Sequence, residues 1–339
     1  MGAIKIIKVI YDVPATEGGA LSILFMYYSR AVEDINNRYI FIVSTPKFDE
    51  RENVKIVRFP WVKKSWLHRI FFEIFCVKKV VSSYSPDQII ALHNMTLYRV
   101  KTPHILYVHQ PLPFSSIRFN LFKEPKFWIY QNIIGQMIIK SINKANCVIV
   151  QTNWMKENLI KYSNVPYSKI LVESPAIISS SSIEVYKESD EIVNFIYPTS
   201  EISYKNYGLI IEAFYYIPKE HFSKIAFYIT LKGNENKKIR TYYKIVQKNK
   251  YPIFFVGKIS KEKVFEYYSK STLVFPSLIE TFGLPLLEAR MHESPILAAN
   301  LEYSREILDG YTKISYFDPK SSEDLSKKIV SRICSIIGG

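Results

Sequence analysis

Short apolar strands alternate with helix-length segments along the whole of this chain, and no other feature constrains its fold as strongly. In the first half, apolar runs rich in β-branched residues cover positions 3–10, 39–45, 54–59, 88–92, 103–109 and 146–151. Helical patterns separate several of these runs, at positions 20–34, 62–83, 127–144 and 153–162. Strands that are apolar throughout and joined by helices are typical of a parallel sheet with helices on both faces.

The same alternation returns in the second half of the chain. The pattern predicts strands at 192–198, 224–231, 252–256, 272–276, 295–299 and 314–317, and helices at 206–216, 235–249, 260–270, 283–293, 303–309 and 321–335. A Ser-rich stretch without a hydrophobic period separates the two halves, as an interdomain linker does. We therefore predict two doubly wound, Rossmann-like α/β domains at 1–175 and 191–339, joined by a linker at 176–190. Parallel sheets bind ligands at the carboxyl ends of their strands, so the site is expected in an interdomain cleft.

The chain is basic, and its charge is uneven. It carries 45 Lys and Arg against 31 Asp and Glu, a net charge of +14, and positions 1–150 alone hold 20 against 10. Nucleic acid, an anionic membrane and phosphorylated substrates are therefore all candidate partners. The three cysteines form neither a disulfide framework nor a zinc spacing, which favours a reducing, cytoplasmic location. No stretch predicts a signal peptide or a membrane span.

The most informative stretch joins a buried strand to a helix. It reads Glu280-Thr281-Phe282-Gly283-Leu284-Pro285-Leu286-Leu287-Glu288. The helix is predicted to open near Gly283, and its free N–H groups and positive dipole end suit a phosphate. Glu288 lies one to two turns into this helix, where a carboxylate can accept both hydroxyls of a ribose diol. The alternative is that Glu280 and Glu288 are ordinary surface acids.

This stretch resembles the E-x7-E region of the family-4 retaining glycosyltransferases, which have the two-domain GT-B fold. The resemblance implies transfer of a hexosyl-type sugar from a UDP- or GDP-linked donor, with retention of anomeric configuration. It assigns ribose binding to Glu288 and a contact with the donor sugar to Glu280. It also assigns contacts with the sugar and diphosphate to the backbone of Phe282, Gly283 and Leu284.

Other stretches of the second domain match the same family. After a strand-Gly turn, the backbone of Lys258 and Ile259 is expected to face the nucleobase. Lys205 stands at the start of a predicted helix, and the resemblance gives it the role of neutralising the leaving diphosphate. The alternative for Lys205 is a solvated surface charge.

One departure from the family concerns the diphosphate. Many members carry Gly-Arg where this chain has Pro198-Thr199-Ser200, and that Arg grips the diphosphate together with the Lys. We therefore expect Lys205 to act with the hydroxyl of Thr199 or Ser200, or with another cation such as Lys258. No Asp-x-Asp motif suited to a metal ion follows the predicted strands, so we expect neither a metal nor another cofactor.

The first domain contributes two features to the resemblance. Gly18 and Gly19 follow the first strand and open a helix, and in the family this loop approaches the donor phosphates and the reaction centre. By itself a Gly-Gly turn is weak evidence. His109 ends a strand at its carboxyl edge, where the family places a His beside the transferred sugar. A structural histidine is the alternative. His109 and Glu280 would orient the sugar, while Lys205 and a helix N-terminus stabilise the departing phosphate.

The basic first half contains an amphipathic segment at positions 61–75, rich in Trp, Phe, Lys and Arg. It is either a helix packed on the sheet or a membrane-surface helix, with aromatic side chains in the interface and cations facing anionic lipid. Residues of a later stretch are expected to share this surface: Phe114, Arg118, Phe119, Lys123 and Lys126. Relatives that build cell-surface polysaccharides, such as lipopolysaccharide or O-antigen, use lipid-diphosphate acceptors. We therefore expect a lipid-linked glycan acceptor and a peripheral position on the inner face of the plasma membrane.

Two other classes of function compete with glycosyl transfer. A sugar-nucleotide epimerase or a glycosyl phosphorylase would keep the fold, but the former needs carboxylates for acid-base chemistry in its first domain and the latter a pyridoxal lysine. A basic nucleic-acid-binding protein is compatible with the charge and the aromatic content. However, no RNA- or DNA-binding motif is present, so nucleic acid is not expected as a partner.

Overall fold

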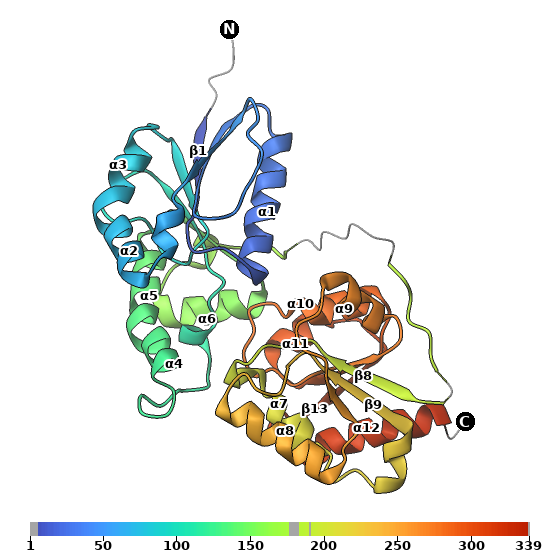
Figure 1. Ribbon diagram of the computed structural model, residues 1–339. Coiled ribbons are helices and arrows are strands. Elements are labelled where there is room, and N and C mark those ends of the chain that lie inside the picture. The colour runs from blue at the N-terminus through green and yellow to red at the C-terminus, as the bar shows by residue number, and fades with distance from the viewer. Residues whose placement is uncertain (1–5, 176–182, 190, 338–339) are drawn as a thin grey trace. The chain divides into compact units, whose positions relative to one another are not determined.

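The computed structural model describes residues 6–175, 183–189 and 191–337 (Figure 1). They form two compact units, Met1–Ala176 and Ile177–Gly339. Each unit is built on its own parallel sheet with helices around it. The predicted α/β class with two doubly wound sheets is therefore confirmed.

The sheet of the first unit has seven parallel strands. They are β1 (Ile7–Asp12), β2 (Arg38–Val43), β3 (Val54–Arg58), β4 (Gln88–Ala91), β5 (His104–Tyr107), β6 (Cys147–Val150) and β7 (Ile170–Val172). Their order across the sheet is β3-β2-β1-β4-β5-β6-β7. The chain thus moves one way from β1 and returns to the other side at β4. This makes the β1/β4 boundary the topological switch point, where such sheets bind ligands.

Helices cover both faces of this sheet (Figure 1). They are α1 (Gly18–Glu33), α2 (Trp66–Phe71), α3 (Val77–Ser82), α4 (Pro125–Ile129), α5 (Gly135–Lys144) and α6 (Asn153–Ser163). Because side chains alternate along a strand, Val9 and Tyr11 pack in one core cluster with α3, α5 and α6, whereas Ile10 packs in another with α1. Two π-helical turns, Phe72–Cys76 and Tyr130–Ile134, interrupt the predicted helices at 62–83 and 127–144.

The second unit has six parallel strands. They are β8 (Val193–Tyr197), β9 (Ile225–Ile229), β10 (Ile253–Phe255), β11 (Thr272–Phe275), β12 (Ile296–Ala299) and β13 (Ile314–Phe317), in the order β10-β9-β8-β11-β12-β13. The switch point here lies between β8 and β11. The helices are α7 (Tyr207–Ala213), α8 (Lys237–Asn249), α9 (Lys261–Tyr268), α10 (Leu284–Met291), α11 (Glu302–Ile307) and α12 (Ser322–Ile337).

The stretch between the two sheets is described only in part. Residues 176–182 and 190 of the expected linker lie outside the described residues. Further along, the Glu184 carbonyl lies 2.6 Å from Nδ1 of His292, and the Lys187 N–H donates to the Ser269 carbonyl at 2.8 Å. Residues 184–187 therefore run along the second unit, fixed by backbone hydrogen bonds.

Candidate functional site

Lys205 and Glu280 meet at the switch point of the second sheet. Lys205 ends a short 3-10 turn after β8, and Glu280 lies in the loop after the neighbouring strand β11. The Lys205 ammonium and a Glu280 carboxylate oxygen are 2.5 Å apart, with side chains 21% and 14% exposed. The structure thus brings together two predicted site residues that are 75 positions apart in the chain.

Hydrogen bonds fix the two loops that carry this ion pair. The Tyr197 hydroxyl donates to the Lys205 carbonyl at 2.6 Å. The Leu278 N–H donates to the Tyr204 carbonyl at 2.8 Å and so ties the loop of Glu280 to the turn of Lys205. Asn206 adopts a left-handed conformation, with φ of 56°, and its side chain donates to the Pro276 carbonyl. The ion pair is therefore held by a rigid frame.

Helix α10 begins beside Glu280. Gly283 caps it with φ of +81°, a conformation that favours glycine, and a proline lies in the first turn. Phe282 and Gly283 are buried, and Leu284 is half-buried. No side chain caps this N-terminus, so its N–H groups and its dipole are directed at whatever lies before the helix.

Glu288 lies on α10 in a second polar group. One of its carboxylate oxygens is 3.5 Å from the Tyr268 hydroxyl, and the other is 3.8 Å from the Lys261 ammonium. Burial raises the pKa of Glu288 to about 7, although Lys261 and Tyr268 oppose this shift. Lys261 begins α9 after the N-cap Ser260, two residues beyond Ile259, which is half-buried, and three beyond Lys258, which is exposed. The expected nucleobase loop is therefore adjacent in the chain to a cation that contacts Glu288.

Thr199 and Ser200 follow β8, half-buried, where the family carries Gly-Arg. The Thr199 N–H donates to the hydroxyl of Thr230 at 2.7 Å, and that hydroxyl donates to the Thr199 carbonyl at 2.9 Å. The Thr199 hydroxyl lies 3.4 Å from the Ser200 carbonyl. Thr230 thus fixes the turn that replaces Gly-Arg. Sequence reasoning missed Thr230, Tyr268 and Lys261, because each acts through a contact between distant segments.

In the first unit, Gly18 and Gly19 open α1 as predicted. Gly18 has φ of +63°, and a Cβ atom added to either glycine would meet no atom within 4 Å. No side chain of the described residues therefore blocks the space in front of this helix start, and a ligand can approach its backbone closely.

His109 follows β5 and is held by Asn94. The Asn94 side chain accepts the His109 N–H at 2.7 Å, and its amide nitrogen lies 3.4 Å from Nε2 of the ring. Burial lowers the pKa of His109 to about 4, so the imidazole is neutral at pH 7. Nδ1 is buried without a hydrogen-bond partner. If Nε2 accepts from Asn94, Nδ1 carries the proton and is a donor.

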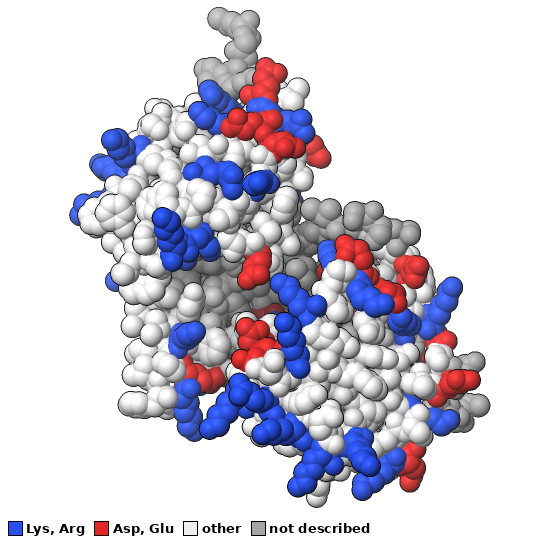
Figure 2. Space-filling model, viewed as in Figure 1, with Lys and Arg blue, Asp and Glu red and all other residues white. Residues whose placement is uncertain are grey.

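An exposed apolar ridge runs along α2 and the π-helical turn after it. Its exposed side chains form two rows four residues apart, Trp66-Ile70-Ile74 and Leu67-Phe71-Phe75, and we call these six residues the aromatic ridge. Trp66 and Leu67 are 69% and 67% exposed, and Phe75 is 68% exposed. Basic side chains lie among uncharged surface on this unit (Figure 2). Lys64, Lys78 and Lys79, which are close to the ridge in the sequence, are exposed.

The stretch 114–126, which was predicted to share the surface of the ridge, contributes different residues to the exterior. Phe114 and Phe119 are buried, at 1% and 9% exposure, because they pack into the unit, so both assignments to the surface were wrong. Phe122 is 92% exposed instead, and Lys123 and Lys126 beside it are exposed as predicted. Arg118 donates to the Tyr162 hydroxyl.

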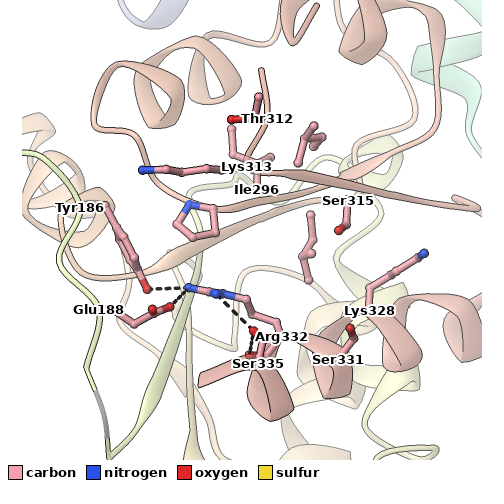
Figure 3. A pocket seen from close by; sticks show the side chains of 13 residues that line it. Tyr186, Glu188, Ile296, Thr312, Lys313, Ser315, Lys328, Ser331, Arg332 and Ser335 are labelled. Atoms are coloured by element: carbon pink, nitrogen blue, oxygen red, sulfur yellow. Dashed lines mark hydrogen bonds and ion pairs between the residues drawn. The ribbon is translucent and has the colours of Figure 1, made fainter. Parts of the chain in front are cut away.

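A surface pocket of about 550 Å³ lies in the second unit (Figure 3). Tyr186, Glu188 and Arg332 line it, and Arg332 donates to both of the others. Pro295 and Thr312, which precede β12 and β13, also line it. The pocket is thus at the amino ends of the strands, opposite the edge that carries Glu280. Among the described residues, no group of three His, Cys, Asp or Glu side chains could hold a metal ion.

Two doubly wound parallel sheets, each with its own switch point, are the architecture of the GT-B fold. The sequence model for group 1 glycosyl transferases matches residues 184–333, and the model for glycosyltransferase family 4 matches residues 30–177. The two matches together span most of the chain, which belongs to the family-4 glycosyltransferases of GT-B fold. The predicted family is therefore confirmed, and the protein is a glycosyltransferase.

Solved structures share the fold across nearly the whole chain. Sucrose-phosphate synthase from Thermosynechococcus elongatus superimposes with a TM-score of 0.72 at 13% identity, over 98% of this chain and 92% of that one. HepE from Anabaena, in complex with UDP and glucose, gives 0.66 at 14% identity, over 98% and 92%. WaaG, a glycosyltransferase involved in lipopolysaccharide biosynthesis, gives 0.67 at 11% identity, over 97% and 90%. No curated protein matches the chain by sequence. In the described part of the chain, every helix is too short or too polar to cross a bilayer.

Proposed function

We propose that this glycosyltransferase moves a hexosyl unit from a UDP- or GDP-linked sugar to a glycan acceptor, with retention of configuration. The observation that carries the proposal is the Lys205–Glu280 ion pair beside the uncapped start of α10, at the switch point of the second sheet. Binding of UDP and UDP-glucose by HepE, which shares the fold, supports a nucleotide-sugar donor.

In this proposal the donor diphosphate lies at the start of α10. Cleavage of the sugar–phosphate bond places negative charge on the β-phosphate, and the first-turn N–H groups together with the Lys205 ammonium stabilise it. Glu280 orients that ammonium and accepts a hydrogen bond from the sugar, while Glu288 accepts hydrogen bonds from the ribose hydroxyls. The departing phosphate helps to take the acceptor proton. Neutral His109 donates a hydrogen bond to the transferred sugar, and neither a metal ion nor a cofactor takes part.

The donor roles are tested by substitution. Lys205→Ala and Glu280→Ala should each lower turnover at least ~100-fold, because each removes an interaction with the reacting groups. Glu288→Ala should abolish binding of a labelled nucleotide sugar. The matched control is Lys270→Ala, which removes an exposed lysine paired with Glu266 at 2.6 Å and should leave turnover unchanged. Near wild-type turnover in both Lys205→Ala and Glu280→Ala refutes the roles assigned to these residues. Salt-sensitive binding of the protein to DNA, without affinity for nucleotide, favours a nucleic-acid-binding function instead.

We further propose that the acceptor is a lipid-diphosphate-linked glycan of cell-surface polysaccharide synthesis, and that the aromatic ridge holds the protein at the cytoplasmic face of the plasma membrane. Exposed Trp and Phe side chains flanked by lysines suit the interface of an anionic bilayer. The shared fold with WaaG, which acts in lipopolysaccharide biosynthesis, supports this class of acceptor.

Membrane attachment is tested by co-sedimentation with vesicles. The wild-type protein should sediment with phosphatidylglycerol vesicles and remain in solution with phosphatidylcholine vesicles. The triple variant Trp66→Ser, Phe71→Ser, Phe75→Ser should lose at least ~10-fold in binding, because three interfacial anchors are removed. The control variant Tyr215→Ser, Phe254→Ser removes aromatics of the second unit that are 79% and 49% exposed. Equal loss in both variants contradicts a role for the ridge.

A further inference from the structure

The surface pocket beside Arg332 has no part in the donor roles, because it lies at the amino ends of β12 and β13. We call it the Arg332 pocket. Its volume of about 550 Å³ is within the range of roughly 300–1,000 Å³ that small-molecule sites occupy. The pocket is thus large enough for a ligand of its own, and its lining residues indicate the chemistry of that ligand.

Helix α12 forms one wall of the pocket with a polar face. Four residues of α12 line the pocket at helical spacing, namely Lys328, Ser331, Arg332 and Ser335. Three other residues of α12 are buried in the unit, Leu325, Ile329 and Ile333. The helix therefore packs through its apolar face and presents ammonium, guanidinium and hydroxyl groups to the pocket.

Positive charge predominates in this lining. Lys313, Lys328 and Arg332 line the pocket together with one carboxylate, that of Glu188. Lys313 also pairs with Glu293 at 2.9 Å, outside the lining. Lys328 is half-buried, and it has no ion-pair partner within the described part of the chain. A half-buried cation that lacks a counter-charge and faces a pocket favours an anionic ligand.

Glu188 occupies the guanidinium of Arg332 in the free protein. Figure 3 shows that guanidinium directed toward Glu188 and Tyr186, and it donates to the Glu188 carboxylate and, at 3.0 Å, to the Tyr186 hydroxyl. Nε of Arg332 lies 3.3 Å from the Thr272 hydroxyl, which holds the guanidinium in place from the start of β11. The side chain of Glu188 is 44% exposed against 19% for Arg332. An exposed ion pair contributes little stability, so another oxyanion can take the place of Glu188 on a guanidinium that is already positioned.

We propose that the Arg332 pocket binds a small sugar phosphate, whose phosphoryl group replaces Glu188 on Arg332 and is also neutralised by Lys328. A guanidinium binds phosphoryl oxygens in the same forked geometry as a carboxylate. Further hydroxyl groups of the lining suit the hydroxyls of a sugar, those of Thr312, Ser315 and Ser331. The pocket lies at the edge opposite Glu280, so this ligand is additional to the donor, and the inference does not depend on the proposed transfer reaction.

Calorimetric titration with ribose 5-phosphate and with glucose 6-phosphate tests the proposal. Saturating UDP or GDP is present throughout, so that the start of α10 is occupied. The wild-type protein should bind at least one of the two sugar phosphates, and it should bind inorganic phosphate at least ~10-fold more weakly, because that ion fills only part of the pocket. Equal affinity for inorganic phosphate would overturn the assignment of a sugar phosphate.

Two variants should change this affinity in opposite directions. Lys328→Gln should weaken sugar-phosphate binding about fivefold, because it removes one partly solvated charge contact. Glu188→Gln should strengthen it about fivefold, because it removes the carboxylate that competes for Arg332. General attraction of an anion to a basic protein cannot produce this pattern at the two positions alone.

Lys327→Gln is the matched control. Lys327 is the adjacent lysine of α12, but it pairs with Glu323 at 2.8 Å and does not line the Arg332 pocket. This variant should keep sugar-phosphate affinity within about twofold of wild type. Equal losses in Lys327→Gln and Lys328→Gln overturn the proposal, as do unchanged or weaker binding in Glu188→Gln and a wild-type protein that binds neither sugar phosphate. Sugar-phosphate binding by a protein without affinity for nucleotide would support the pocket and contradict the proposed transfer reaction.

Discussion

Glu288 shows how a single residue can couple donor binding to pH. Burial raises its pKa to about 7, so the carboxyl is mostly protonated at pH 6 and mostly ionised at pH 8. Only the ionised form accepts hydrogen bonds from both ribose hydroxyls. Affinity for UDP or GDP, measured by calorimetric titration, should therefore fall up to about tenfold from pH 8 to pH 6. The nucleotide phosphate titrates in the same range, so the affinity of Glu288→Gln is measured in parallel as a control. If nucleotide affinity depends equally steeply on pH in that variant, Glu288 is not the group responsible.

The same shift predicts an effect of opposite sign on stability. A carboxyl whose pKa is higher in the folded than in the unfolded state binds more protons when folded, so the free energy of unfolding falls as pH rises from about 4.5 to about 7. Glu288→Gln removes this titration. In urea unfolding between pH 5 and pH 8, the wild-type protein should lose more stability than the variant. An identical pH dependence in both would mean that Glu288 titrates normally.

The sequence predicts some of the site residues and misses others for a physical reason. Lys205 and Glu280 each lie in the loop after a predicted strand, and parallel strands bring their carboxyl ends to one edge, so their proximity is a consequence of topology. Tyr268 contacts Glu288 from another helix, and Thr230 fixes Thr199 from just after β9. No local pattern marks such partners, because they are selected by packing between segments that are distant in the chain.

The start of α10 depends on a glycine. Gly283→Ala forces a residue with a Cβ atom to φ of +81°, and that atom would lie 3.3 Å from the Leu286 side chain. The variant should lose about 1–2 kcal/mol of unfolding free energy and should also bind nucleotide more weakly, because the first-turn N–H groups shift. Urea unfolding and calorimetric titration measure the two effects.

Gly310→Ala is the matched control for this element. Gly310 has φ of +68°, and a Cβ atom there would meet nothing within 4 Å. Gly310 lies between α11 and β13, at the amino edge of the sheet and away from the start of α10. Gly310→Ala should therefore lose a similar amount of unfolding free energy but leave nucleotide affinity unchanged. If both variants weaken nucleotide binding equally, the effect belongs to general destabilisation and not to the start of α10.

Most elements were predicted from their apolar patterns, with one strand missed. Twelve of the strands match predicted apolar runs, whereas β7, Ile170–Val172, has two exposed side chains in its three residues and so shows no buried run. Both π-helical turns lie inside segments that read as continuous helices, because one extra residue in a turn leaves the apolar pattern almost unchanged. One of these turns carries Glu73, whose buried position beside His93 no local pattern predicts.

Each of the two units has a switch point with its own chemistry. The second unit presents a lysine, a helix start and two carboxylates, which suit a nucleoside diphosphate. The first unit presents the open start of α1, which suits an approaching phosphate, and the neutral His109, which suits a sugar hydroxyl. In the proposed transfer, the second unit therefore holds the anionic nucleotide, and the first unit contributes groups that contact the sugar being transferred.

Hydrogen exchange of the full chain tests this division. Saturating UDP or GDP should slow amide exchange at 257–261 and 280–288 in the second unit, because the nucleotide orders these loops. Phosphatidylglycerol vesicles should instead slow exchange at 66–82 in the first unit. Helix α12, which lines the Arg332 pocket at the opposite edge of the second sheet, should respond to neither. Nucleotide protection at α12, without protection at 280–288, would move the donor site to that pocket and overturn the roles of Lys205, Glu280 and Glu288 together.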